Sequence, residues 1–133
     1  MDCRCLIVDP STMVRRVASR IIKDLGLDVI EARSGEEALD ICADRMPSAI
    51  LFDWTLSDMD ASLFLAQLSK TVDRQSAANP TLIFCSGERN VERIVDALRA
   101  GADEYIMKPF DSDIIQSKFA LAGLIEEAPC VAA

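Results

Sequence analysis

The sequence of 133 residues predicts an α/β fold in which helices cover both faces of a five-stranded, mostly parallel sheet. Short apolar runs alternate with longer segments whose apolar residues recur near the helical period, and this alternation is typical of such sheets. Four of the apolar runs lead directly into the polar residues Asp9, Asp53, Ser86 and Lys108. Because ligands bind at the carboxyl ends of parallel strands, the same pattern predicts where a functional site should lie.

The first half of the chain predicts three strands that alternate with two helices. The strands are expected at residues 4–8, 28–32 and 49–53. The first helix should cover residues 12–25 and stop at Gly26, because glycine readily ends a helix. Its expected apolar stripe consists of Val14, Val17, Ile21 and Leu25. Ser34 and Glu37 form a capping box that opens the second helix, and Pro47 ends that segment.

The second half predicts three more helices and two more strands. The helices are expected at residues 62–70, 90–100 and 112–125, and the strands at residues 81–86 and 104–107. The polar stretch at residues 71–80 indicates a loop, and Gly101 should stop the fourth helix. We therefore expect one domain over residues 1–125, followed by a flexible tail at residues 126–133 that contains Pro129.

The composition argues against several classes of function. The net charge of −8 disfavours nonspecific binding to nucleic acid or to anionic membranes, because both need basic surfaces. The chain has no histidine, so any phosphohistidine donor must be on another molecule. With no basic-then-apolar leader and no apolar run near the ~20 residues of a membrane span, we expect a cytoplasmic protein. The five cysteines favour reduced, mostly buried thiols, although Cys3 and Cys5 leave a zinc or disulfide role open.

The polar residues at the strand ends form the candidate site. In a parallel sheet Asp9, Asp53, Ser86 and Lys108 should converge at one edge. Two acids, a hydroxyl and a lysine suit the reception of a phosphoryl group, which depends mostly on positioning and on the neutralisation of charge. An ionised Asp53 would meet an anionic donor. A Mg²⁺ ion held by carboxylates and carbonyls would remove that repulsion.

The ordered set of motifs resembles the receiver domain of bacterial two-component response regulators. The motifs are Leu6-Ile7-Val8-Asp9, Leu51-Phe52-Asp53-Trp54, Ser86, Ala100-Gly101-Ala102-Asp103, and Tyr105 through Lys108-Pro109-Phe110. The resemblance spans residues 4–125 and implies a flavodoxin-like, doubly wound fold with the strand order 2-1-3-4-5. Because no effector domain follows, the chain looks like a stand-alone regulator of the chemotaxis or cell-cycle kind.

The resemblance implies roles for the residues that receive and sense the phosphoryl group. Asp53 matches the phosphoacceptor, and Lys108 matches the lysine that contacts the phosphoryl oxygens. Ser86 matches the switch hydroxyl, and Tyr105 matches the aromatic residue whose ring swings inward on activation. The implied donor is a histidine kinase or a histidine phosphotransfer protein. The implied output is the binding of another protein by the fourth helix, the fifth strand and the fifth helix.

The implied metal site departs from the family pattern. Asp9, Asp53 and the backbone carbonyl of Thr55 match metal ligands, but Pro10 stands where the family usually has a second acid. Proline offers no side-chain ligand, so Mg²⁺ binding should be weaker and phosphorylation slower. The alternative is therefore a pseudo-receiver that binds proteins without being phosphorylated. The Lys108-Pro109 bond is commonly cis in this family.

Two other classes of function fit less well. An aspartyl phosphohydrolase usually needs a second acid two residues after its nucleophile, and that position is Thr55. A dinucleotide-binding domain would need a glycine-rich loop after the first strand, where the chain has Pro10-Ser11-Thr12.

Three further features concern the loops and the first helix. Leu56-Ser57 and Asp60-Ala61 replace the family's usual residues after the third strand. That loop should therefore differ, because alanine adopts positive φ less readily than glycine. Arg15 and Arg16 are expected on a solvated rim.

Overall fold

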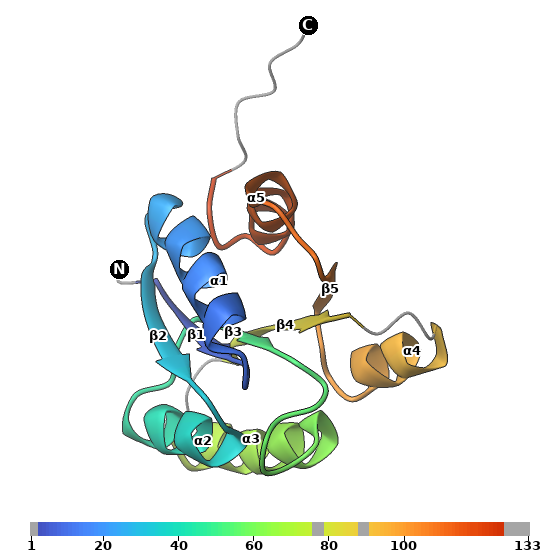
Figure 1. The fold of residues 1–133 in the computed structure, drawn as a ribbon. Helices are drawn as coiled ribbons and strands as arrows, with labels where there is room; N and C mark the ends of the chain where they lie inside the picture. The colour runs from blue at the N-terminus through green and yellow to red at the C-terminus, as the bar shows by residue number, and fades with distance from the viewer. Residues whose placement is uncertain (1–2, 76–78, 88–90, 127–133) are drawn as a thin grey trace, which may run out of the picture.

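The computed structural model describes residues 3–75, 79–87 and 91–126, and it contains the predicted five-stranded sheet (Figure 1). The strands lie in the predicted order β2-β1-β3-β4-β5. Their bounds are β1 Arg4–Val8, β2 Asp28–Ala32, β3 Ala49–Phe52, β4 Thr81–Ser86 and β5 Glu104–Met107. Every neighbouring pair is parallel, so the carboxyl ends of all five strands lie at one edge.

In the described part of the chain five helices alternate with the strands. They are α1 Thr12–Asp24, α2 Gly35–Asp44, α3 Ala61–Gln75, α4 Val91–Arg99 and α5 Ser112–Leu121. Helices α1 and α5 cover one face of the sheet, and α2, α3 and α4 cover the other (Figure 1). This is the predicted doubly wound arrangement. None of these helices is long and apolar enough to cross a membrane.

The central strands bury side chains on both faces of the sheet. Along β1, Leu6 and Val8 belong to the hydrophobic cluster on the α2, α3 and α4 side, whereas Cys5 and Ile7 belong to the cluster on the α1 and α5 side. All four residues of β3 are buried, because helices cover both faces and strands flank both sides. Burial on two faces explains why these strands are continuous apolar runs without polar alternation.

The residues that α1 buries differ from the apolar stripe that the sequence predicts. Ala18 and Ile22 are fully buried, whereas Val17 is 46% exposed. The buried positions also include Arg15 and Ser19, which carry polar groups. The buried face of α1 therefore carries polar as well as apolar side chains.

Two helix ends also differ from the prediction. Helix α3 continues to Gln75, into the predicted loop, and its extra turn buries Val72. Helix α5 ends at Leu121 rather than at residue 125, because Gly123 adopts a φ of +76° that stops the helix. Asn90 and the tail from residue 127 onward lie outside the described residues.

Helix α2 has the Ser34 cap of the predicted capping box, whereas the Glu37 side chain contacts Arg33. The Ser34 hydroxyl accepts a hydrogen bond from the Glu37 N–H at 3.1 Å, which caps the helix. The Glu37 carboxylate lies 3.8 Å from the guanidinium of Arg33. On the buried side, Ala38 and Cys42 are fully covered.

The cysteines that the structure describes form no disulfide; they are Cys3, Cys5, Cys42 and Cys85. Burial raises the pKa of Cys5, Cys42 and Cys85 to about 12. These three thiols therefore stay protonated at neutral pH and act as small apolar core side chains. Cys130 lies outside the described residues.

Substituting Phe64→Ala should lower the free energy of unfolding by about 3–5 kcal/mol, because it removes a fully buried ring from α3. Leu63→Ala is the matched control on the same helix. Its side chain is 48% exposed, so the loss should be about 1 kcal/mol or less. Urea denaturation followed by circular dichroism measures both changes. Equal losses for the two variants would contradict the orientation of α3.

Candidate functional site

The predicted convergence of polar residues at the carboxyl edge of the sheet is present. Asp9 follows β1, Asp53 follows β3, and Lys108 follows β5. The Lys108 ammonium donates hydrogen bonds to Oδ2 of Asp9 at 2.6 Å and to Oδ2 of Asp53 at 2.8 Å. The Asp9 carboxylate is 5% exposed and the Asp53 carboxylate 17% exposed, so solvent reaches Asp53 more readily.

Hydrogen bonds keep Lys108 charged. Burial alone would lower the pKa of Lys108, but its hydrogen bonds to Asp53 and Asp9 outweigh burial and raise the pKa above 10.5. The stabilisation from these contacts is present below the pKa of the unfolded lysine. It is lost only as the pH rises through the higher folded value. At neutral pH Lys108 is therefore an ammonium that contacts both carboxyl groups.

The other oxygens of the two acids also contact protein donors. Oδ1 of Asp9 accepts a hydrogen bond from the Ser11 N–H at 2.8 Å. Oδ1 of Asp53 accepts a long one from the Thr55 N–H at 3.5 Å. The Ser11 hydroxyl in turn caps α1 by accepting from the Val14 N–H. The carboxylates are therefore oriented before any ligand arrives.

Two further predicted residues, Ser86 and Tyr105, lie on β4 and β5. Ser86 ends β4 in a buried position, and its carbonyl accepts the Lys108 N–H at 3.0 Å. The ring of Tyr105 is half-buried and stacks on Phe84 with centroids 5.5 Å apart. Trp54, next to Asp53, meets the same Phe84 edge-on at 5.9 Å. One phenylalanine thus connects the residue beside Asp53 to Tyr105. The Lys108-Pro109 bond is cis.

The acids present fit a Mg²⁺ ion. Asp9 and Asp53 offer the carboxylate oxygens that this ion prefers, whereas the exposed Pro10 offers none. Within residues 3–75, 79–87 and 91–126 no three metal-ligating side chains converge. Mg²⁺ usually binds through one or two carboxylates and completes its shell with water. Two aspartates therefore suffice for binding, but they provide less charge than three acids would.

The loop after β3 closes without a glycine. Ala61 is the first residue of α3, and its N–H donates to the Trp54 carbonyl at 2.9 Å. Asp60 caps the same helix by accepting from the Leu63 N–H at 2.9 Å. Thr55 and Asp60 form an isolated antiparallel bridge. A helical residue at position 61 needs no positive φ, so alanine is accommodated there.

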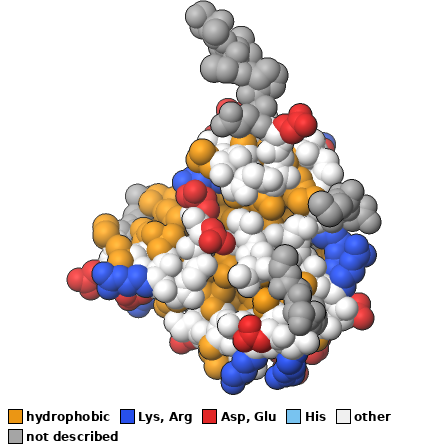
Figure 2. Space-filling view, turned by 180° about the vertical axis from the view of Figure 1, so that it is seen from behind, with side chains coloured by type: hydrophobic (Ala, Val, Ile, Leu, Met, Phe, Trp, Pro, Cys, Tyr) orange, Lys and Arg blue, Asp and Glu red, His pale blue; other side chains and the backbone are white. Residues whose placement is uncertain are grey.

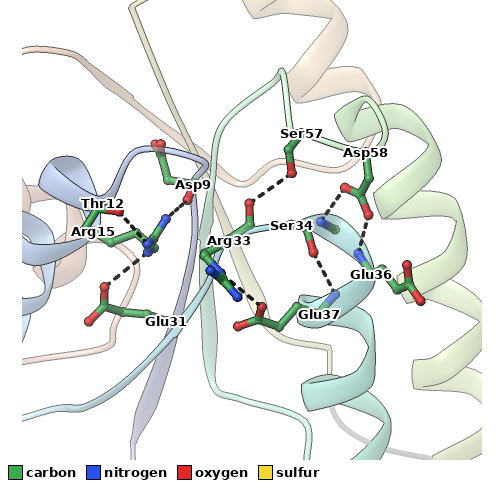
Figure 3. A network of polar contacts seen from close by, with 11 residues as sticks. Asp9, Thr12, Arg15, Glu31, Arg33, Ser34, Glu36, Glu37, Ser57 and Asp58 are labelled. Atoms are coloured by element: carbon green, nitrogen blue, oxygen red, sulfur yellow. Dashed lines mark hydrogen bonds and ion pairs between the residues drawn. The ribbon is translucent and has the colours of Figure 1, made fainter.

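The contact of Asp58 with the start of α2 has no signal in the local sequence pattern (Figure 3). Its carboxylate accepts hydrogen bonds from the N–H groups of Gly35 at 2.8 Å and Glu36 at 2.9 Å. Burial would raise the pKa of Asp58, but these two hydrogen bonds prevail and lower it below 3.8. The Met59 side chain packs over Gly35, where an added Cβ would lie 2.6 Å from the methionine sulfur. This part of the loop is therefore fixed to α2.

The expected solvated rim of α1 is correct for Arg16 and wrong for Arg15. Arg16 is exposed, whereas only 6% of Arg15 is accessible to solvent. The guanidinium of Arg15 contacts Asp9, Thr12 and Glu31 (Figure 3). The helical period predicts an exposed position for Arg15, because it takes no account of polar partners on other elements.

Comparisons with known proteins give the family and the fold of the chain. The family model of the response regulator receiver domain matches residues 5–120. The chain is 32% identical to the chemotaxis protein CheY of Bacillus subtilis (strain 168) over 114 residues, which is 85% of this chain and 91% of that protein. A CheY-like receiver domain protein from Methanospirillum hungatei is 29% identical, with a TM-score of 0.76 over 93% of this chain and 94% of that one. A two-component response regulator from Clostridium difficile shares the fold, with a TM-score of 0.81 and 19% identity over 90% of this chain and 94% of that one.

Substituting Asp58→Asn should destabilise the domain by about 0.5–1.5 kcal/mol, because the amide nitrogen cannot accept one of the two N–H groups that the carboxylate now accepts. The pKa of the Asp58 carboxyl is lower in the folded than in the unfolded protein. Its contribution to stability is therefore present above the unfolded pKa and disappears as the pH falls through the folded pKa. The difference in Tm between the two proteins, measured calorimetrically, should therefore be present at pH 7 and shrink below pH 3.8. Asp40 is exposed on α2, the helix that Asp58 contacts, and the control variant Asp40→Asn should change the Tm little. A pH-independent difference for Asp58→Asn would contradict this role.

Proposed function

The chain belongs to the response regulator receiver family, and on that premise we propose that it receives a phosphoryl group on Asp53 and signals by binding another protein. The donor is a phosphohistidine on a histidine kinase or a histidine phosphotransfer protein, since this chain has no histidine of its own. The observation that carries the proposal is the Lys108 ammonium between the carboxylates of Asp9 and Asp53. Such a domain acts as a phosphoacceptor rather than as an enzyme on a separate substrate.

The chemistry is a direct transfer between two nucleophiles. One carboxylate oxygen of Asp53 forms a bond to phosphorus as the bond from phosphorus to the donor imidazole nitrogen breaks. The electron pair leaves with the imidazole, and Asp53 becomes an acyl phosphate. Lys108 neutralises charge on the phosphoryl oxygens, which is the main catalytic requirement of such transfers. Asp9, Asp53 and the carbonyl of Thr55 would hold Mg²⁺, which supplies further positive charge when bound.

The readout would begin at the end of β4. The acyl phosphate adds charge and acceptor oxygens, which can draw the Ser86 hydroxyl toward Asp53. Movement of that loop would open space for the ring of Tyr105. The affected surface is the proposed output face of α4, β5 and α5. It carries Val91, Leu98, Met107, Ile114 and Leu121, which are 39–70% exposed. The hydrophobic surface around α4 is visible from behind (Figure 2).

A pseudo-receiver remains the second candidate, and two observations favour it. Pro10 removes one metal-binding acid, and the carboxylate oxygens of Asp9 and Asp53 already contact protein donors. In that case the chain would bind its partner without phosphorylation. Titration of Mg²⁺ and then of beryllofluoride, followed by the fluorescence of Trp54, separates the two candidates. A response to both supports phosphoryl reception, and a response to neither supports the pseudo-receiver.

Substituting Asp53→Asn should abolish labelling by a cognate kinase or by acetyl phosphate, because the amide is not a nucleophile toward phosphorus. The measurement is incorporation of radioactive phosphate under denaturing conditions that preserve acyl phosphates. Asp40→Asn, at an exposed position on α2, should label like the wild type. Labelling that persists in the Asp53 variant would overturn the assignment.

Substituting Pro10→Asp should raise the affinity for Mg²⁺ by about tenfold, because carboxylate number sets the affinity of such sites. Quenching of the single tryptophan, Trp54, during a Mg²⁺ titration reports the change. Pro10→Ala is the control, since it relieves the proline constraint without adding a ligand. An equal gain from alanine would show that backbone restriction, rather than a missing acid, weakens the site.

A further inference from the structure

Arg15 is a buried cation with three different partners. Its Nη1 donates to the backbone carbonyl of Asp9 at 2.6 Å, and its Nη2 donates to Oγ1 of Thr12 at 3.1 Å. Its Nε lies 3.4 Å from Oε1 of Glu31 at the end of β2. Because these partners use different nitrogens of one planar group, the guanidinium is held in a fixed orientation.

The contact with Asp9 involves the segment where the chain departs from its family. The Asp9 carbonyl directly precedes Pro10, which has no N–H to anchor the loop. The N–H of Asp9 donates to the Ala32 carbonyl at 3.1 Å, and its carboxylate contacts Ser11 and Lys108. The backbone carbonyl is the remaining polar atom of Asp9, and it accepts the hydrogen bond from Arg15. This hydrogen bond fixes the backbone at the point from which the carboxylate projects.

We propose that Arg15 is a positioning residue of the phosphoryl-receiving site, which holds the main chain of Asp9 so that its carboxylate can bind a divalent cation beside Asp53. The inference rests on the proposed function. With Pro10 in place of an acid, Asp9 and Asp53 are the two carboxylates proposed to hold the metal. A shift of the Asp9 carboxylate would therefore strongly lower the affinity for the metal. Residues that orient metal ligands without touching the metal commonly change its affinity by about 10–100-fold.

The shape of arginine is required for this role. A lysine at position 15 would keep the positive charge near Glu31 but would place one point charge where the guanidinium forms three separate contacts. The neighbouring Arg16 is exposed and provides a matched control. Its substitution removes the same charge from the same helix without touching Asp9.

The test compares Arg15→Met, Arg15→Lys and Arg16→Met with the wild type. The Trp54 fluorescence of each protein is titrated with Mg²⁺, and the rate of phosphorylation by acetyl phosphate is then measured from low to saturating Mg²⁺. Arg15→Met should bind Mg²⁺ about tenfold more weakly, Arg15→Lys should lie between it and the wild type, and Arg16→Met should match the wild type. Because the defect is in metal binding, saturating Mg²⁺ should restore most of the rate.

Each outcome decides the proposal. Unchanged Mg²⁺ affinity in Arg15→Met, or a rate that stays low at saturating Mg²⁺, overturns the positioning role while leaving the proposed function intact. If Arg15→Met does not fold, as judged by circular dichroism, the better-tolerated Arg15→Lys decides by the same two criteria. A wild-type protein that responds to neither Mg²⁺ nor acetyl phosphate overturns both the proposed function and the role of Arg15.

Discussion

The site depends on a single ammonium group that two carboxylates share. Asp9 and Asp53 follow neighbouring strands, and like charges placed so close repel unless a cation lies between them. Lys108 follows β5, which β4 separates from β3, so its side chain must cross the end of β4. Because strands lie about 4.8 Å apart, only a long side chain spans that gap. The parallel sheet keeps the three strand ends level and makes the contact possible.

The loops that carry the two acids are held by contacts to backbone groups. On the α1 side, Arg15 donates to the carbonyl of Asp9. On the α2 side, Asp58 accepts from the first N–H groups of that helix. Each charged side chain satisfies main-chain atoms, so each contact constrains the path of the chain itself. With Ser11 capping α1 and Asp60 capping α3, both loops are also fixed where they enter a helix.

Sequence patterns predicted the features that depend on neighbours along the chain. Short apolar runs located every strand within one residue, and the parallel order then placed Asp9, Asp53 and Lys108 together. The burial of Arg15 could not be predicted in this way, because its partners include β2, and a charged residue on an amphipathic helix normally faces solvent. The contacts of Asp58 reach more than twenty residues back in the chain. A local hydrophobic period cannot predict contacts between residues so far apart in the chain. The contacts of Arg15 and of Asp58 both lie at the site.

The contact between Met59 and Gly35 restricts how this sequence can diverge. A side chain at position 35 would require the side chain of Met59 to shift, and the same two segments are joined by the carboxylate of Asp58. The space available to the residue at position 35 is therefore set by the side chain at position 59. The two positions are coupled through space, although a whole strand and helix separate them in the chain.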